Sequence, residues 1–300
     1  MSSPIVRPDI SVVILAKNEE AKIGRCLERL ASQRAPYRLE TLLIDSGSTD
    51  RTIAIARERG ATVVEIPPAS FNYGTTRNEA LRWVHGERVL FLTAHAYAAD
   101  NTWLAELGRP LDLDPKTAAA FSREIPDDAC PDLERRALEP IFPEGAYLQD
   151  LAGRSLEEFL AERRWVTFSN VSSIVRTEVL AAIPFRALPG AEDQEWAVRV
   201  LAAGHRIAYA AASRIVHYND DPLPAMIRRT YRNWRVYAPL YHRRLGLGDL
   251  ARSIPSSIAG EFAFARRRAR RPVPHFLRSC VWWPAFWVAA YAGSRNPAWT

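Results

Sequence analysis

The chain has 300 residues, of which 48% are hydrophobic and 25% charged, so it is not intrinsically disordered and has room for one large domain or two small ones. Its three cysteines are far apart and form no CxxC pair, which argues against a disulfide scaffold or a zinc ribbon and favours a reducing compartment. The formal net charge is +6, but fourteen arginines against two acids give residues 225–300 a charge of +12. This basic C-terminal part predicts an anionic partner there, either a membrane surface or a phosphorylated substrate.

The sequence predicts neither a secretory signal nor a transmembrane helix. The first ten residues contain no apolar core of the kind that a signal peptide needs. The densest apolar run, 281–292, has twelve residues, whereas a bilayer-spanning helix needs about 20. We therefore expect a cytoplasmic protein, with the inner face of the membrane as its candidate location.

Strand and helix signals alternate over the first third of the chain. Continuous apolar runs predict strands at 10–16, 41–44, 61–66 and 88–93. Helical spacing predicts helices between them at 19–33, 49–60 and 73–85. Apolar runs without polar alternation are typical of strands covered on both faces. This order predicts an α/β fold with a doubly wound, mostly parallel sheet.

The rest of the chain is less regular. Further strands are expected at 117–123, at 165–175 as one strand or a pair, at 206–209 and at 215–217. Helices are expected at 176–183 and 192–203, and 124–164 should be mainly loop. Beyond Pro222 the pattern is helical to Leu245, then typical of a linker, then basic and apolar. We therefore expect one domain over 1–245 and a C-terminal extension over 246–300 that associates with a membrane surface.

Polar residues follow several of the predicted strands and helices. They are Asn18, Glu19, Asp45, Ser46, His95, Glu192, Asp193 and His217. Ligands of open α/β sheets bind beyond the carboxyl ends of the strands, so this accumulation predicts a site at one edge of the sheet. Each residue alone has a simpler explanation as a turn or cap residue.

Three common nucleotide-binding and hydrolase motifs are missing at the places where they would act. No GxGxxG follows the first predicted strand, GxxxxGK[ST] does not occur, and Ser46 and Ser48 do not lie in GxSxG. The segment DSGSTD supplies a carboxylate and hydroxyls suited to a base or a ribose. It lacks the glycines that wrap a pyrophosphate.

Six segments together resemble the family 2 glycosyltransferases of the GT-A fold, over roughly residues 10–220. They are SVVILAKNEE, LLIDSGSTDRT, FNYGTTRNEAL, LFLTAHAYAADNTWL, PGAEDQEWAVRVLAAGHRIAY and IVHY. FNYGTTRN is similar to the rhamnosyltransferase-like subgroup. The resemblance implies transfer of a sugar from a nucleoside-diphosphate sugar to the hydroxyl of a saccharide or lipid-linked acceptor, in polysaccharide or glycolipid synthesis.

The resemblance also implies roles for single residues. Asp45 would contact the nucleobase or ribose, and Asp193 would be the general base of an inverting reaction with Glu192 beside it. The other donor-binding positions are Asn18, Glu19, Ser46, Arg77 and Asn78, of which Arg77 is suited to reach a phosphate. Since Asp193 begins a predicted helix, we expect the helix dipole to favour its ionised form.

The sequence departs from the family after the fourth predicted strand. The family usually has a DXD-type motif there that binds a divalent metal on the diphosphate, whereas this chain has Thr93-Ala94-His95-Ala96-Tyr97. In one interpretation His95 replaces the aspartate as ligand of manganese or magnesium, with His217 as a second ligand. In the other, His95 contacts the diphosphate directly and a metal is weak or absent. The second histidine slightly favours the metal.

The alternative function is a non-catalytic membrane- or nucleic-acid-binding protein on a degenerate transferase fold. The missing DXD carboxylates favour this hypothesis, and the presence of Asp45 and Asp193 argues against it. The segment RRRARR at 266–271 is suited to the phosphates of a nucleic acid. The adjacent tryptophan-rich apolar run is typical of helices at a lipid surface, so we expect no nucleic-acid partner.

Overall fold

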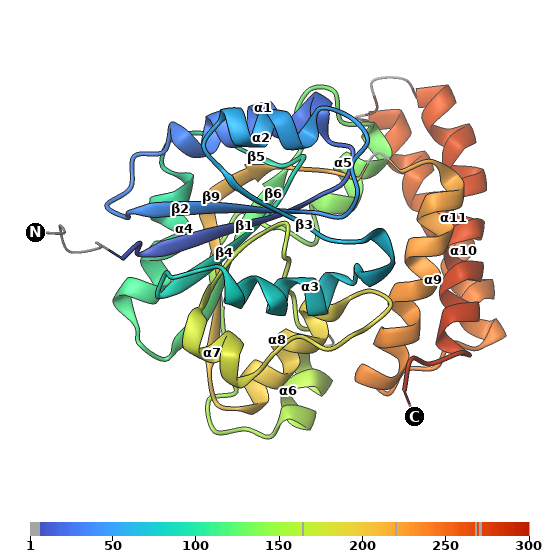
Figure 1. Ribbon diagram of the computed structural model, residues 1–300. Coiled ribbons are helices and arrows are strands. Elements are labelled where there is room, and N and C mark those ends of the chain that lie inside the picture. Colours follow the sequence, from blue (N-terminus) through green and yellow to red (C-terminus); the bar gives the residue numbers. More distant parts are fainter. Residues whose placement is uncertain (1–6, 164, 220, 268, 270–271, 300) are drawn as a thin grey trace, which may run out of the picture.

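The computed structural model describes residues 7–299 apart from 164, 220, 268 and 270–271, and shows a nine-stranded sheet between layers of helices (Figure 1). The strands are β1 (Ile10–Ala16), β2 (Leu39–Asp45), β3 (Thr62–Glu65), β4 (Arg88–Thr93), β5 (Tyr97–Ala98), β6 (Thr117–Ile125), β7 (Tyr147–Gln149), β8 (Ser172–Arg176) and β9 (Arg206–Val216).

The helices fall into three groups in space. One face of the sheet carries α1 (Glu20–Ala31), α2 (Thr52–Glu58) and α4 (Trp103–Leu113). The other face carries α3 (Tyr73–Glu79), α6 (Leu156–Arg163), α7 (Thr177–Ala182) and α8 (Glu192–Ala202). Beside the sheet lie α5 (Asp132–Leu138), α9 (Leu223–Leu240), α10 (Leu247–Arg267) and α11 (Pro272–Ser294).

The sheet is mixed, and its order is β3-β2-β1-β4-β8-β6-β9-β5, with β7 also paired to β9. Neighbouring strands from β3 to β4 are parallel. β8 lies antiparallel between β4 and β6, and β6 is parallel to β9. The predicted doubly wound α/β fold is therefore confirmed, with the antiparallel pairings β4–β8, β6–β8, β5–β9 and β7–β9 all beyond its parallel part β3-β2-β1-β4.

Alternate residues of the buried strands face two separate cores, which explains their continuous apolar sequence. In β1, Ile14 packs under α1 and α2, whereas Val13 faces the core that contains α8. In β4, Leu90 faces the core under α1 and α2, and Phe91 faces the core that contains α8.

The C-terminal helices form one packed layer with α9. Trp282 of α11 packs with Met226 of α9, and Ala290 packs with Trp234. A Cβ on Gly293 would collide with the backbone oxygen of Tyr231, so only glycine allows α11 to cross α9 this closely. The predicted boundary at residue 245 thus runs between helices that pack against each other. Among the described residues, none of the helices combines the length and apolarity needed to cross a bilayer.

Three predictions of local structure were wrong. The segment expected to be a linker forms α10, because its Pro255 and glycines are accommodated within a helix that packs against α11. Within 165–175 only the part that belongs to β8 is a strand. Trp165 and Phe168 lie in the loop before it, where their side chains pack against Trp234 and Trp196. The strands expected at 206–209 and 215–217 are one strand, β9. Of RRRARR, Arg268, Arg270 and Arg271 lie outside the described residues.

Candidate functional site

The carboxyl ends of β1, β2 and β4 meet at one edge of the sheet. In the strand register Ala16 pairs with Asp45, and Leu15 pairs with Thr93. The residues that follow, Lys17, Ser46 and His95, therefore come together although they are far apart in sequence. They line a cavity of about 240 Å³, which we call the strand-end cavity.

Asp45 and Asn18 build the loops around this cavity. Asp45 is fully buried, and its Oδ1 accepts hydrogen bonds from the backbone N–H groups of Gly47 (2.9 Å) and Ser48 (2.7 Å). Asn18, at φ 54°, accepts from the Thr49 N–H (2.8 Å) and donates its own N–H to the Ser48 hydroxyl (2.8 Å). The Asp45 carboxylate is thus used inside the turn, and neither Asp45 nor Asn18 lines the strand-end cavity itself.

Pro68 forms part of the wall of the strand-end cavity, next to the turn that contains Ser46. Gly47 has φ +91°, and a Cβ there would lie 2.6 Å from Pro68 Cγ, so this turn requires glycine. Phe71 and Tyr73 continue this wall, with ring centroids 4.8 Å apart. The result is a recess with one aromatic side and one polar side, of the kind in which a flat polar ligand is held.

A second, larger cavity adjoins the first, and we call it the central cavity. It has a volume of about 410 Å³ and is lined by residues of the α8 N-terminus and of the loop before β8, by His217 and by α9 residues between Arg229 and Tyr237. Five residues line both cavities: Tyr73, Arg77, Thr93, His95 and Asn170. A ligand in one cavity can therefore contact a ligand in the other.

A buried ion pair separates the two cavities from the core. Arg77 of α3 donates from one terminal nitrogen to Glu192 Oε1 at 2.5 Å and to the Tyr73 carbonyl oxygen at 3.2 Å. The side chains are only 9% and 8% exposed, so each charge depends on the other for compensation. Arg77 thus lies where the sequence predicted, but Glu192 neutralises its charge.

Asn78 does not lie where the sequence predicted. Its amide nitrogen donates to the Phe185 carbonyl oxygen (2.8 Å), and its oxygen accepts from the Phe185 N–H (2.9 Å). Neither the strand-end nor the central cavity includes it in its lining. Asn78 fixes the loop after α7 instead of facing a ligand.

Asp193 lies in the first turn of α8, in the wall of the central cavity. Its Oδ1 accepts from the Gln194 N–H (2.8 Å) and its Oδ2 from the Asn170 N–H (3.3 Å). Burial, followed by the negative charge of Glu192, raises the pKa of Asp193 to about 7. The expectation that the helix dipole keeps this carboxyl ordinarily acidic was wrong. Desolvation and the neighbouring carboxylate outweigh Arg77 and the two backbone N–H groups.

His95 and His217 lie side by side, each held by a glutamate. His95 Nδ1 is 2.9 Å from Glu19 Oε1, and His217 Nδ1 is 2.7 Å from Glu124 Oε2. The two rings stack with centroids 5.2 Å apart and planes inclined by 25°. These contacts leave Nε2 of each ring for a ligand in the central cavity, which both histidines line.

This pair does not fit a divalent metal. The lone pair of an imidazole nitrogen lies in the ring plane, so two nearly parallel stacked rings direct their lone pairs side by side rather than at one ion. The part of the chain that the structure describes contains no group of three or more His, Cys, Asp or Glu side chains able to hold a metal. The favoured interpretation, with His95 and His217 as joint ligands, is therefore not supported by the geometry.

Sequence reasoning missed two residues of this site. Glu124 lies at the end of β6, and its other oxygen accepts from the Ser169 hydroxyl at 2.6 Å. Tyr237 lies on α9 and reaches the central cavity from outside the sheet. The available signal for Glu124 was its place at the end of a predicted strand, whereas no sequence pattern indicates how α9 is placed.

This fold is that of the GT-A glycosyltransferases. The mannosyltransferase PcManGT of Pyrobaculum calidifontis, in complex with GDP-Man and Mn²⁺, has a TM-score of 0.61 at 19% identity over 99% of this chain and 88% of its own. S. aureus TarS in complex with UDP-GlcNAc has a TM-score of 0.56 at 21% identity, over 90% of this chain and 79% of its own. At these identities the likeness shows the fold alone.

The chain belongs to glycosyl transferase family 2, whose family model matches residues 11–165, just over half of its length. It is 28% identical over 199 residues to the O-antigen chain rhamnosyltransferase RfbN of Salmonella typhimurium, covering 63% of this chain and 60% of that protein. It is 30% identical over 191 residues to the O-antigen chain rhamnosyltransferase WbaN of Salmonella anatum, covering 60% of this chain and 57% of that protein. The chain thus spans under two thirds of these relatives.

Proposed function

We propose that the protein is an inverting glycosyltransferase. It moves a sugar from a nucleoside-diphosphate sugar to the hydroxyl of a saccharide or lipid-linked acceptor in cell-envelope polysaccharide synthesis. Family membership supports the reaction class, and the likeness to two O-antigen rhamnosyltransferases supports the pathway. The observation that carries the proposal is Asp193, a carboxyl in the central cavity with a pKa of about 7.

The donor occupies the strand-end cavity in this proposal. Its base and ribose lie against the turn that Asp45 organises, between Ser46 and the aromatic wall of Phe71 and Tyr73. Its diphosphate points toward His95, where the two cavities meet. The sugar then lies within reach of the central cavity.

Asp193 acts as the general base. A carboxylate accepts the proton of the acceptor hydroxyl most effectively when its pKa is close to the working pH, and the pKa of Asp193 is raised to about 7. A base on the acceptor side, opposite a leaving diphosphate, gives in-line displacement with inversion.

The Lys17 ammonium meets the charge of the leaving diphosphate in this proposal. Lys17 is exposed and lines the strand-end cavity together with His95, whereas Arg77 is committed to Glu192. Fixed cations placed where charge develops stabilise the transition state. PcManGT was solved with Mn²⁺, but here the two histidines do not converge on an ion, so we assign them no metal.

We place the protein in the cytoplasm, at the inner face of the membrane. The positive charge of residues 225–300 and the exposed apolar side chains Leu277 (62%) and Val281 (58%) of α11 support this location. Cationic and apolar groups on one helix are the two components of interfacial binding.

The test is Asp193→Asn. We expect it to keep nucleoside diphosphate binding and to lose transfer by about 10³-fold, since a general base contributes about 10²- to 10⁴-fold. The matched control is Asp9→Asn, the same change at the amino end of β1, where Asp9 pairs with Arg38. If Asp193→Asn keeps transfer within about tenfold of wild type, a loss of only ~1.4 kcal/mol, the assignment is wrong.

A further inference from the structure

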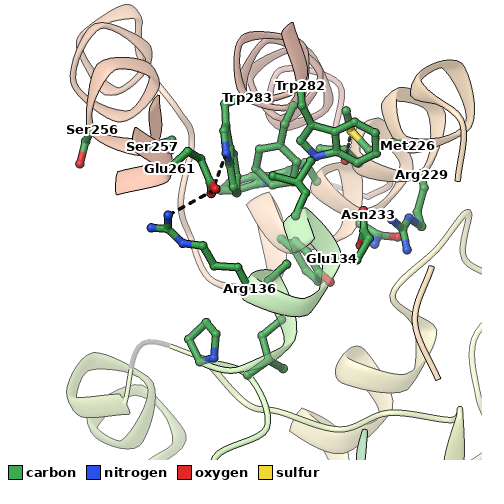
Figure 2. Close-up of a pocket in the computed structure, with 18 residues that line it drawn as sticks. Glu134, Arg136, Met226, Arg229, Asn233, Ser256, Ser257, Glu261, Trp282 and Trp283 are labelled. Carbon is green, nitrogen blue, oxygen red and sulfur yellow. Dashed lines mark hydrogen bonds and ion pairs between the residues drawn. The ribbon is translucent and has the colours of Figure 1, made fainter. Parts of the chain in front are cut away.

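A third cavity lies between α5, α9, α10 and α11, and we call it the helical cavity. Its volume is about 640 Å³, the largest of the three described here. Figure 2 shows Trp282, Trp283 and Met226 around it, and Trp234 and Phe286 also line it. A space this large with aromatic walls is suited to an apolar ligand.

The polar groups at the far side of this cavity already have partners. Glu261 is buried, accepts from the Trp283 indole N–H (3.1 Å) and pairs with Arg136 at 3.3 Å (Figure 2). It also lies 2.7 Å from His275 Nε2. Since these groups satisfy each other, the side of the cavity around Glu261 needs no polar atom from a ligand. The part of a ligand that lies against Met226, Trp282 and Phe286 is therefore hydrocarbon.

The helical cavity adjoins the central cavity. Ile141, Arg229, Asn233 and Tyr237 line both. Asn233 also lies against Gly190, three residues before Asp193, so closely that a Cβ on this glycine would collide with Asn233 Oδ1. The end of the helical cavity that Arg229 and Asn233 line thus borders the loop that carries the proposed base.

The outer surface of α11 is apolar as well. Val273, Leu277, Val281 and Val288 are 54–68% exposed, and their spacing places them on one side of α11. An apolar stripe beside arginines such as Arg278 is typical of a helix at a lipid surface. The residues of α11 that line the helical cavity, Trp282 and Phe286, lie on the other side of this helix, so α11 has one apolar side toward the cavity and one toward the outside.

We propose that the helical cavity binds the hydrocarbon chain of an amphipathic acceptor, whose hydroxyl-bearing sugar lies beside Asp193 in the central cavity. This inference rests on the proposed function, and it selects a lipid-linked saccharide over a free one. Asn233 and Arg229 lie at the junction, where the polar head of such a molecule begins (Figure 2).

The experiment is a calorimetric titration of the full chain with n-alkyl β-glucosides from hexyl to decyl, each below its micelle concentration. We expect binding to tighten about fourfold with each methylene that enters the cavity, and methyl glucoside to bind weakly. Ala137→Trp fills the lining of the cavity and should abolish the dependence on chain length. The control is Ala259→Trp, at an exposed position of α10 outside the cavity lining, which should retain it.

Two results would overturn the inference: a wild-type affinity independent of chain length, or a dependence that survives Ala137→Trp in a variant that melts cooperatively. The wild-type series stands without any variant, so misfolding of Ala137→Trp does not remove the test. Failure of the proposed function appears elsewhere, as absent nucleoside diphosphate binding or as transfer that does not depend on Asp193.

Discussion

The charge of Glu192 sets the pH at which Asp193 can accept a proton, and Glu192→Gln tests this directly. Glu192 raises the pKa of Asp193 and also compensates Arg77, which lowers it. Glutamine removes the negative charge but keeps an oxygen acceptor for the guanidinium. Both consequences, the loss of a like charge and the uncovering of Arg77, lower the pKa of Asp193.

The size of the effect follows from the raised pKa of about 7. In the wild type about one tenth of Asp193 is ionised at about pH 6, so kcat/KM should fall about tenfold per pH unit below 7. Removal of one neighbouring charge shifts a pKa by about one to two units. The variant should therefore keep most of its own maximal kcat/KM at about pH 6.

The assay is kcat/KM for sugar transfer between about pH 5 and 9 at constant ionic strength, with the melting temperature of each variant as a check. Glu195→Gln is the control, since this carboxylate lies on the same helix but pairs with Arg186 and Arg199. Glu195→Gln should not change the pH at which kcat/KM falls on the acidic side of the profile. Two results would refute this account of Asp193: an acidic fall in kcat/KM at the same pH in Glu192→Gln as in the wild type, or a wild-type kcat/KM that stays constant down to about pH 5.

Three further predictions concern the nucleotide, the histidines and the C-terminal helices. Asp45→Ala should weaken nucleoside diphosphate binding in calorimetry. It should also lower the free energy of unfolding by about 1–3 kcal/mol, because the N–H groups of Gly47 and Ser48 lose their acceptor. An unchanged affinity would remove Asp45 from the site. Wild-type transfer should persist in EDTA, and His95→Asp should impair it by setting a negative charge against the diphosphate; loss of activity in EDTA with recovery in Mn²⁺ would show a metal role instead. The full chain should sediment with anionic vesicles at low salt and be released at high salt, at about 1 kcal/mol for each arginine near the surface; no sedimentation at low salt contradicts the membrane assignment.

The local sequence predicted the parallel half of the sheet well, because its strands are apolar runs closed by turns. The predicted strand at 88–93 coincides with β4, and that at 10–16 with β1. The prediction from local sequence failed at α10, where a proline and several glycines indicated a linker. The segment is a helix because its packing against α11 outweighs the low helix propensity of these residues. Helix formation there depends on contacts that no local pattern contains.

For the candidate site too, some features could be predicted from the sequence and others could not. Asp193 and Glu192 stand at a predicted helix start, and their place in the cavity wall follows from the topology of an α/β sheet. The partners of these groups did not follow from the sequence, since Arg77 and Glu192 are 115 positions apart and Glu124 and His217 are 93 apart. The raised pKa of Asp193 depends on those partners, so the sequence alone indicated the wrong acidity.

The insertion of β8 between β4 and β6 has a consequence for synthesis of the chain. β4 ends at Thr93, but its antiparallel neighbour β8 begins only at Ser172. At about 5–20 residues per second, the ribosome needs several seconds to make the intervening segment. Throughout that interval β4, with the sequence RVLFLT, is paired on one side only, to β1, and its open edge is a template for pairing with other chains. The most aggregation-prone period of this nascent protein should therefore fall between the completion of β4 and the emergence of β8.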